Sequence, residues 1–497
     1  MTLLCVAGPS RGRPGRTRSY REVLLASLAL CAAALSACAP DLGPAPKLSE
    51  PAAYATEKSF AVAGTDWPAQ DWWTVYGDLQ LDQLEGEAIH GAPDLKAAQA
   101  RVRSAQGVAE QARAALLPQF SGDGSIQTTK QSVNEGFPPE FQAFLPHGYH
   151  TQTRIAADLD WQLDFFGRNR AALAAATSSA RATEADAAAA RLQITAAVAS
   201  SYADLVRLYA DRDAAADALR VREDTLKLVG QRLHNGLETR GEYSQQAQTV
   251  PTARGDLEAI DRQILTVRHE IAALMGEGPD RGLAISRPAS TQLRAFGLPP
   301  HLSADLIGRR ADIVAARLRA EAASKQVKVA RTDFYPNVDL TGFYGVQSLG
   351  LNTLTQYGSV IGAIGPAVRL PIFSEGRLEG AYRGARAEYD AAVANYDQAL
   401  TNALRDVADA VSDQRALQSQ VVDAEQARTS AEDAFRIAKL RYQGGLSPYL
   451  NVLTAENGVL TARRNVADLQ AQALSLDVSL VRALGGGYTE PTRLAVR

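Results

Sequence analysis

The stretch that decides the fold runs from Arg168 to Val229 and reads RNRAALAAATSSARATEADAAAARLQITAAVASSYADLVRLYADRDAAADALRVREDTLKLV. It contains no glycine and no proline, and alanine and charged residues dominate it. Glycine and proline destabilise helix interiors, whereas alanine, arginine, leucine and glutamate are strong helix formers. The stretch therefore predicts one helix of roughly 90 Å, at about 1.5 Å per residue. Because globular helices average about 11–12 residues, such a helix does not belong to a compact core.

A seven-residue spacing of apolar side chains along this helix predicts a coiled coil. The spaced residues are Val198, Leu205, Leu219, Leu226 and Leu233, with Tyr202, Tyr209 and Ala216 beside them and Arg212 as the polar interruption. A seam of this period is buried only when another helix packs against it. We therefore expect neighbouring helices along most of its length.

Residues 1–37 have the organisation of a lipoprotein signal peptide. Several arginines precede an apolar segment, Val23 to Leu35, that is too short for a permanent membrane span. The segment ends in Leu35-Ser36-Ala37-Cys38, which resembles the lipobox of bacterial lipoproteins and implies cleavage before Cys38 and acylation of its thiol. Two or three acyl chains on one residue anchor a protein stably. The alternative is an ordinary secretory signal with an incidental cysteine.

Composition and motifs exclude several classes of protein. The net charge of −3 gives no basic surface for nucleic acid. Cys5 and Cys31 would leave with the signal and Cys38 would carry lipid, so we expect no thiol to remain for a disulfide or a metal. His147 and His150 share a loop without further ligands, and no catalytic triad or phosphate loop is present. We therefore expect no enzyme and no cofactor or metal beyond the covalent lipid on Cys38.

Two pairs of alternating stretches predict β-hairpins. In the first pair, apolar and polar residues alternate from Gln119 to Thr129 and again from Ile155 to Leu163. In the second pair the apolar positions are Val338, Leu340 and Tyr344, then Ile364, Val368, Leu370 and Ile372. A period of two gives each hairpin one apolar and one polar face.

The chain repeats itself at an offset of 209 residues. The matches are Gly167-Arg168 with Gly376-Arg377, Arg232 with Arg441, Gly236-Leu237 with Gly445-Leu446, Thr252-Ala253-Arg254 with Thr461-Ala462-Arg463, and Gly276 with Gly485. Upstream, Asp94 and Pro118 match Asp312 and Pro336 at an offset of 218, so the first hairpin has the longer loop. Each repeat therefore predicts a helix, a hairpin, a long helix, a turn and a returning helix.

These patterns predict the division of the chain. The segments are a signal peptide at 1–37, an extended lipid-anchored tether at 38–70, a first repeat at 71–276, a connector at 277–303, a second repeat at 304–487 and a tail at 488–497. The first repeat holds a hairpin at about 118–166, a long helix at 168–233 and a return helix at 242–275, interrupted at Pro251; the second holds the equivalents at 336–374, 377–443 and 447–484. The paired Trp72 and Trp73 are interpreted as packing residues.

Four strands in one chain predict an oligomer. Open sheet edges cannot face lipid, and bacterial barrels begin at about eight strands. A dimer would supply eight strands and a trimer twelve. Because the long helices also have seams on more than one side, a ring of chains satisfies both the strands and the helices.

Short motifs over essentially the whole mature chain resemble those of the TolC-like outer-membrane efflux lipoproteins, also called outer-membrane factors. They are Trp72-Trp73, Leu117-Pro118, Phe165-Phe166-Gly167-Arg168, Gly297-Leu298-Pro299, Arg309-Arg310-Ala311-Asp312-Ile313, Tyr335-Pro336 and Arg441-Tyr442-x-x-Gly445. One departure is Ala311, where the family usually has proline, and we expect a slightly looser helix start there.

The resemblance implies a fold, a location and partners. The fold would be a mixed α/β membrane protein: a homotrimer whose twelve-strand outer-membrane β-barrel continues into a twelve-helix periplasmic coiled-coil tunnel. The implied location is the outer membrane, with a lipid anchor and an extension into the periplasm. The implied partners are outer-membrane lipid, a periplasmic adaptor (membrane fusion) protein and an inner-membrane pump, often of the proton-driven resistance-nodulation-division type.

The resemblance also places a periplasmic gate at the two helical turns. Matched by position, Glu242 keeps an acid in the first repeat, whereas Asn451 and Thr454 stand where acids often occur in the second. We expect one ring of Glu242 carboxylates, whose mutual repulsion eases opening. Further contacts in the closed state are expected from Tyr442, Arg232 and Arg441. The alternative is that Glu242 only caps its helix.

Other candidate sites follow from the same resemblance. Gly236-Leu237 and Gly445-Leu446 are candidate adaptor contacts, because each glycine ends a helix and each leucine would present an exposed apolar side chain. The alternative is that each leucine packs back on its own hairpin. Asp158, Asp160 and Asp339 are expected to face water inside the barrel, or simply to be solvated.

The leading function is a passive outer-membrane conduit for the efflux of small molecules. One alternative is the outer-membrane duct of a type I protein-secretion system. A second, from a different class, is a lipid-anchored coiled-coil envelope scaffold without a pore. The amphipathic hairpins argue against the scaffold, because a spacer would not need strands with an apolar face.

Overall fold

A computed structural model describes residues 39–56, 58–60, 66–130, 132, 138, 148–289, 306, 308–371 and 374–490. The predicted signal peptide, Cys38, His147, residues 290–303 of the connector and residues 491–497 of the tail lie outside the described residues. The chain divides into two compact units. The strand unit comprises the described residues of 1–45, 110–175 and 323–389, and the helical unit those of 46–109, 176–322 and 390–497.

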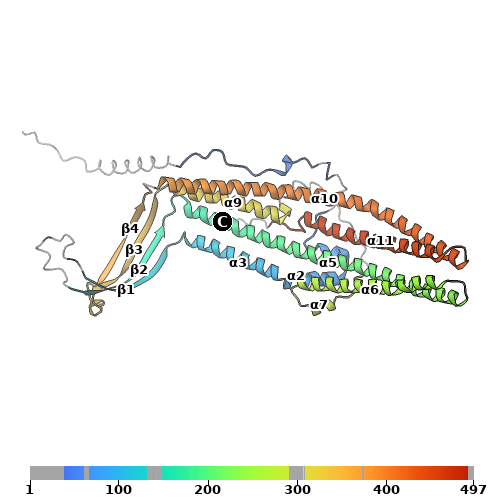
Figure 1. Cartoon of the computed structure of the whole chain (residues 1–497). Coiled ribbons are helices and arrows are strands. Elements are labelled where there is room, and N and C mark those ends of the chain that lie inside the picture. Colours follow the sequence, from blue (N-terminus) through green and yellow to red (C-terminus); the bar gives the residue numbers. More distant parts are fainter. Residues whose placement is uncertain are drawn as a thin grey trace, which may run out of the picture. The chain divides into compact units, whose positions relative to one another are not determined.

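The strand unit contains one antiparallel sheet with the order β1-β2-β3-β4 (Figure 1). The strands are β1 (Gln119–Thr129), β2 (His150–Gln162), β3 (Asn337–Leu349) and β4 (Val360–Arg369). The two hairpins of the two repeats are joined through β2 and β3. In the described chain β1 and β4 therefore form the two edges, each with an unpaired row of backbone groups.

The pairing register separates an apolar face of the sheet from a polar one, as the alternation predicts. Residues directly opposite each other on neighbouring strands share a face. Leu159 lies between Phe120 and Gly342, whereas Asp160 lies between Gln119 and Thr341. The apolar face is uncovered in the single chain: Phe120, Tyr344 and Ile364 are 76%, 70% and 71% exposed.

Four long helices form two helical hairpins. They are α5 (Arg168–His234), α6 (Arg240–Leu274), α10 (Glu375–Gln443) and α11 (Tyr449–Ala483). In Figure 1, α6 runs beside α5 and α11 beside α10; we call α5 with α6 the first helical hairpin and α10 with α11 the second. No helix in the described part of the chain is both long and apolar enough to cross a membrane.

The first return helix is continuous, so the interruption expected at Pro251 is wrong. α6 runs through this proline. Proline removes one backbone hydrogen bond and strains the preceding turn. Val250 and Ala253 on either side are 8% and 3% exposed, and their packing holds the helix across the defect.

Several shorter helices lie outside the two helical hairpins. They are α2 (Leu79–Gly91), α3 (Pro93–Ala114) and α9 (Ala311–Thr332), with a small α7 (Pro279–Leu283) and three 3-10 turns at Pro51–Ala53, Trp72–Tyr76 and Leu351–Thr353. The sequence patterns did not predict α2 or α7. α2 begins with a clear cap, since one Asp78 carboxylate oxygen accepts hydrogen bonds from the backbone N–H groups of Gln80 and Leu81.

The core of the helical unit explains the tryptophan pair. Trp72 and Trp73 are 1% and 5% exposed and pack in one cluster with residues of α2, α5, α6 and α11. Their interpretation as packing residues is confirmed. The predicted seam joins this cluster at Val198, Tyr202 and Leu205, which are fully buried. Further along α5 the seam residues are only half-buried in the single chain: Leu219, Leu226 and Leu233.

The segment predicted as an extended tether packs through apolar side chains where it belongs to the helical unit. Leu48, Tyr54, Phe60 and Trp67 pack against a buried cluster that includes Tyr396 and Leu400 of α10. The backbone N–H of Ser49 also donates a hydrogen bond of 3.1 Å to Asp397. Apolar residues spaced between the prolines make this packing possible.

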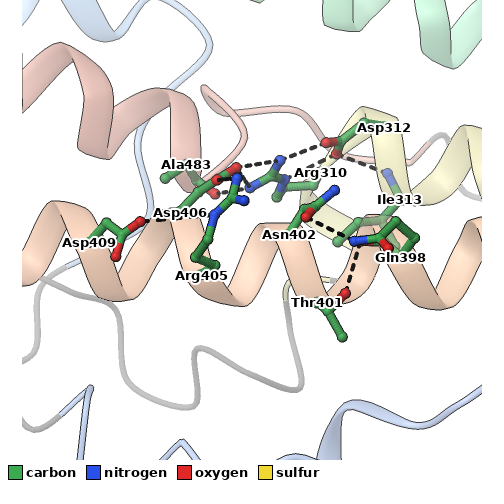
Figure 2. A network of polar contacts seen from close by, with 10 residues as sticks. All are labelled: Arg310, Asp312, Ile313, Gln398, Thr401, Asn402, Arg405, Asp406, Asp409 and Ala483. Carbon is green, nitrogen blue, oxygen red and sulfur yellow. Dashed lines mark hydrogen bonds and ion pairs between the residues drawn. The ribbon is translucent and has the colours of Figure 1, made fainter.

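Arg310 fastens the start of α9 to the second helical hairpin (Figure 2). Its guanidinium makes a bidentate ion pair with Asp312, at 3.0 and 2.6 Å, and donates to Asp406 of α10 at 3.3 Å and to the carbonyl of Ala483 at 3.2 Å. α9 begins at Ala311 without the usual proline. Arg310 therefore stabilises the start of α9, which lacks the fixed backbone conformation of a proline.

Candidate functional site

The two helical hairpins end in turns of matching geometry, 209 residues apart. In the first, the N–H of Leu237 donates to the carbonyl of Arg232 at 2.8 Å; in the second, the N–H of Leu446 donates to that of Arg441 at 2.8 Å. Gly236 and Gly445 adopt φ values of 70° and 71°, which favour glycine. Both helices therefore end in the glycine-terminated turn that the sequence predicts.

Each turn presents an exposed leucine. Leu237 is 64% exposed and Leu446 is 74% exposed. Neither side chain packs back onto its own hairpin to any large extent in the single chain. The alternative in which each leucine is buried against its own hairpin therefore does not describe the single chain.

A compact polar cluster joins the two turns, and we call it the tip lock: Arg232, Glu238 and Tyr442. One carboxylate oxygen of Glu238 accepts a hydrogen bond of 2.9 Å from Arg232 Nε and another of 2.9 Å from the Tyr442 hydroxyl. The Arg232 guanidinium also lies over the Tyr442 ring, 5.0 Å from its centroid. The tip lock therefore ties the first helical hairpin to the second.

Burial strengthens this cluster. Glu238 and Arg232 side chains are 8% and 24% exposed. Burial, together with the hydrogen bond to the Glu238 carboxylate, raises the pKa of Tyr442, so its hydroxyl keeps its proton and remains the donor. A charge-assisted hydrogen bond at a desolvated site is stronger than one in water.

Glu238 was missed by sequence reasoning. The turn contains two acids, Glu238 and Glu242, and matching by position selected only the second. A usable signal was its place directly after Gly236-Leu237, where a side chain can fold back on the last turn of α5.

Glu242 is occupied in a capping box. Its carboxylate accepts hydrogen bonds of 2.8 Å from the backbone N–H and from the hydroxyl of Thr239, and its own N–H donates to Thr239 Oγ1 at 3.2 Å. The backbone hydrogen bond from Thr239 lowers the pKa of this carboxyl, followed by the other hydrogen bonds. The helix-capping alternative thus describes what Glu242 does within one chain.

The remaining predicted gate residues lie outside the tip lock. Arg441, Asn451 and Thr454 are exposed, and the Thr454 hydroxyl donates to the carbonyl of Leu450 at 2.9 Å. The structure therefore brings together Arg232 and Tyr442 from the predicted set and adds Glu238.

The three predicted acids of the sheet share its polar face but not its solvent exposure. Asp158 pairs with Arg154 at 3.0 Å, and Arg154 also pairs with Asp123 at 3.1 Å. Against the expectation of a water-facing carboxylate, the Asp339 side chain is only 9% exposed, with Arg369 at 3.9 Å and Asn337 at 3.3 Å. Polar neighbours opposite and beside it in the sheet close over this carboxylate.

The described part of the chain contains no group of three or more histidine, cysteine, aspartate or glutamate side chains placed to hold a metal ion. Of the two loop histidines, His150 lies at the start of β2 and His147 lies outside the described residues.

Comparisons with known proteins identify the family of this chain. Residues 84–277 and 302–486 match the model of the outer membrane efflux protein family. The fusaric acid resistance protein FusA of Burkholderia cepacia is 36% identical over 67% of this chain and 64% of its own length, so the match spans less than two thirds of that protein. The pyoverdine export outer membrane protein OpmQ of Pseudomonas putida is 30% identical over 95% of this chain and 99% of its own.

A solved structure shows the same fold. The outer membrane protein VceC of Vibrio cholerae is 42% identical and superposes with a TM-score of 0.79, covering 85% of this chain and all of that one. The family match includes both repeats and both helical turns. On these grounds the chain belongs to the outer membrane efflux protein family.

Proposed function

We propose that this chain is one protomer of a homotrimeric outer-membrane channel that conducts small molecules passively out of the cell in a tripartite efflux system. The observation that carries the proposal is the four-stranded sheet, which has an exposed apolar face and two unpaired edges. An exposed apolar face and unpaired strand edges are unfavourable for an isolated sheet in water. Both are stabilised when the face contacts lipid and the edges pair with strands of neighbouring chains.

Three protomers would complete the sheet. Pairing β4 of one protomer with β1 of the next keeps every pair antiparallel, because the four strands alternate in direction. Three chains would then close a twelve-strand β-barrel, with the polar face carrying Asp158 and Asp160 towards its lumen. The same ring would set the half-buried seams of the long helices against each other as a periplasmic tunnel.

The tips of the helical hairpins would be the periplasmic end of the channel. There Leu237 and Leu446, with Gly236 and Gly445, would meet a periplasmic adaptor protein, which links the channel to an inner-membrane pump of the resistance-nodulation-division type. The tip lock would hold this end narrow. Three Glu242 carboxylates around the axis would form the ring that attracts cations, in addition to their role as caps.

The lipid anchor on Cys38 would add a second attachment to the outer membrane. The segment that follows it is packed on α10 from Leu48 onwards, so an acylated Cys38 would be joined to the helical unit through an ordered segment. The names of the relatives refer to fusaric acid resistance and pyoverdine export. We infer small organic molecules as the class of cargo for this chain also.

Reconstitution of the full-length purified protein in a planar bilayer tests the proposal. We expect trimers that conduct ions in discrete steps. Assembled protein that never conducts would support the envelope scaffold and overturn the channel. Deletion of the gene separates the two transport readings: sensitivity to small toxic compounds supports efflux, whereas loss of a secreted protein without such sensitivity supports a type I secretion duct.

A further inference from the structure

An open cleft lies within the strand unit, where the sheet ends and the long helices begin. Its volume of about 730 Å³ is within the range of ligand pockets. Three arginines line it: Arg168 at the start of α5, Arg369 at the end of β4 and Arg377 in the first turn of α10. The acids of the described lining are Asp164 and Asp333. Among the residues that the structure describes, the lining therefore carries more positive than negative charge.

Both of these acids already have partners of their own. The Asp164 carboxylate accepts hydrogen bonds from the backbone N–H groups of Asn169 and Arg170, at 3.1 and 2.9 Å. It also pairs with the Arg170 guanidinium at 3.1 Å, so it is used to hold the start of α5. Asp333 pairs with Arg168 at 2.7 Å. Neither carboxylate is therefore left to neutralise the other two arginines of the cleft.

The internal repeat shows that Arg377 lacks the partner that its equivalent has. Arg377 follows Arg168 by 209 residues, yet its exposed side chain forms no ion pair among the described residues. The position that matches Asp333 in the first repeat, 218 residues earlier, is Ala115. A neighbouring chain that packed its first repeat on α10 in the way α9 packs on α5 would therefore offer Arg377 an alanine instead of a carboxylate.

Arg369 is also poorly neutralised. Its distance to the Asp339 carboxylate is 3.9 Å, and its side chain is 81% exposed. Asp339 also accepts a hydrogen bond from Asn337. Because a long, exposed ion pair contributes little, two guanidinium groups without a close carboxylate line the same cleft. Guanidinium groups bind carboxylate and phosphate groups well, since their planar N–H donors match the paired oxygens of these anions.

The same cleft has an aromatic surface. Phe166 and Tyr335 line it and stack on each other, with ring centroids 4.8 Å apart and an angle of 14° between the rings. Phe166 is 43% exposed, and Leu370 beside the cleft is 45% exposed. A further aromatic ring can therefore pack against the exposed part of Phe166. The cleft thus combines an anion site with an apolar surface.

The sheet residues of the cleft include three that belong to its polar face. Asn337 lies directly opposite Arg369, and Gln162 lies directly opposite Asp339, so all three share the face that carries Asp339. Gln162 Nε2 donates to Asn337 Oδ1 at 2.6 Å. In the proposed channel this face is turned towards the lumen. The cleft would then open onto the path of the cargo.

We propose that this cleft binds small aromatic anions, with Arg377 and Arg369 holding the carboxylate or phosphate group and Phe166 contacting the ring. This inference rests on the proposed function and names a class of its cargo. Pores for anions use arginines in this way. The cleft would supply a favourable position for an anion in a lumen whose other proposed charges, Asp160 and Glu242, are acidic.

Equilibrium dialysis of radiolabelled benzoate against the purified full-length protein tests the cleft. Benzoate has a carboxylate on an aromatic ring, whereas benzyl alcohol lacks the charge and acetate lacks the ring. We expect saturable binding of benzoate to the wild-type protein, and weak displacement by either of the other two compounds. Absence of saturable binding would overturn the site, and displacement by acetate as effective as by unlabelled benzoate would overturn the contact with the ring.

Arg377→Gln should weaken the binding of benzoate about tenfold or more, because it removes a charged hydrogen-bond donor without breaking an ion pair described in the protein. Arg377→Lys keeps the charge but not the planar donors, so it should bind with intermediate affinity. The matched control is Arg383→Gln on the same helix, where the arginine is 64% exposed and pairs with Glu379. Wild-type affinity in Arg377→Gln, or an equal loss in the control, would overturn the assignment.

A membrane phospholipid is another source of an anion joined to an apolar group. Phosphatidylglycerol in detergent micelles should displace benzoate less effectively than unlabelled benzoate does. More effective displacement by this lipid would assign the cleft to a lipid head group and overturn the cargo site.

Planar bilayers separate this inference from the proposed function. Benzoate should reduce the single-channel current of wild-type trimers, and it should reduce that of Arg377→Gln trimers less. Protein that binds benzoate but never conducts would overturn the proposed function and leave the cleft as an anion site. Trimers that conduct but bind no benzoate would leave the function standing and overturn this inference alone.

Discussion

The Tyr202 hydroxyl of α5 donates a hydrogen bond of 2.7 Å to Asp78, the residue that caps α2. Tyr202 is fully buried and Asp78 is 6% exposed. One carboxylate therefore both starts a short helix and fixes that helix to the long one. The contact shows how α2, which precedes the first β-hairpin in the chain, is held to α5.

Tyr202→Phe should destabilise the helical unit. The change removes the hydroxyl and leaves a buried Asp78 oxygen with less hydrogen bonding, which costs about 1–3 kcal/mol. Thermal unfolding followed by circular dichroism should show a lower midpoint. Tyr357→Phe is the matched control, since Tyr357 is fully exposed. Equal midpoints for the two variants would contradict this role of Tyr202.

Tyr442→Phe should open the tip lock without removing its aromatic ring. The Arg232 guanidinium can still lie over the ring, but Glu238 loses one of its two hydrogen-bond donors. We expect higher resting conductance in planar bilayers. Tyr243→Phe, a tyrosine near the same turn that is 36% exposed, serves as the control. No change in Tyr442→Phe would show that the tip lock does not restrict the opening.

Glu242→Gln separates the proposed charge ring from the helix cap. Glutamine can replace glutamate in a capping box, so the start of α6 should persist. The loss of three like charges around the axis should lower cation selectivity and change the single-channel current. Unchanged conductance and selectivity would leave Glu242 with its capping role alone.

Leu237→Asp combined with Leu446→Asp should abolish export while trimers still form. Charged side chains on the two exposed turns would oppose an apolar contact with the adaptor. Export is measured in cells that lack the native gene. Leu283→Asp in α7, where the leucine is 56% exposed, controls for surface charge. Normal export by the double variant would remove the adaptor contact from the turns.

Glu85 should make stability depend on pH. It is fully buried, neither carboxylate oxygen has a hydrogen-bond partner among the described residues, and burial raises its pKa from 4.5 to about 9. The folded state therefore keeps a proton that the unfolded state releases above pH 4.5, so stability falls as the pH rises from about 4.5 to about 9. Glu85→Gln should unfold at a higher temperature than wild type at pH 8 and show a flatter dependence. Parallel curves for the two proteins would contradict this.

Much of the architecture was predictable because its signals are local and repeated. The absence of glycine and proline over 62 residues gives α5, alternation gives the strands, and the 209-residue offset gives the second repeat. α2 was not predicted because it depends on contacts with distant segments, such as the hydrogen bond between Tyr202 and its capping residue Asp78. The interruption expected at Pro251 was wrong for a similar reason, because the packing of the buried residues beside it outweighs the local cost of a proline in a helix.

The site was harder to predict because it depends on contacts between distant segments. The turns were visible in Gly236-Leu237 and Gly445-Leu446, but the pairing of Glu238 with Tyr442 joins residues 204 positions apart. The same applies to Arg222 and Glu456, which lie on different hairpins. Sequence spacing within a helix cannot show which charge on another helix will face it.

The two sheet edges also matter before any channel exists. A newly made chain carries β1 and β4 without partners, and an unpaired edge is a template for pairing with any exposed strand. Chains that meet in the wrong register would aggregate through these edges rather than through their helices. Delivery and assembly must therefore be fast compared with such encounters, and overproduction is expected to yield aggregates in which β1 and β4 are protected.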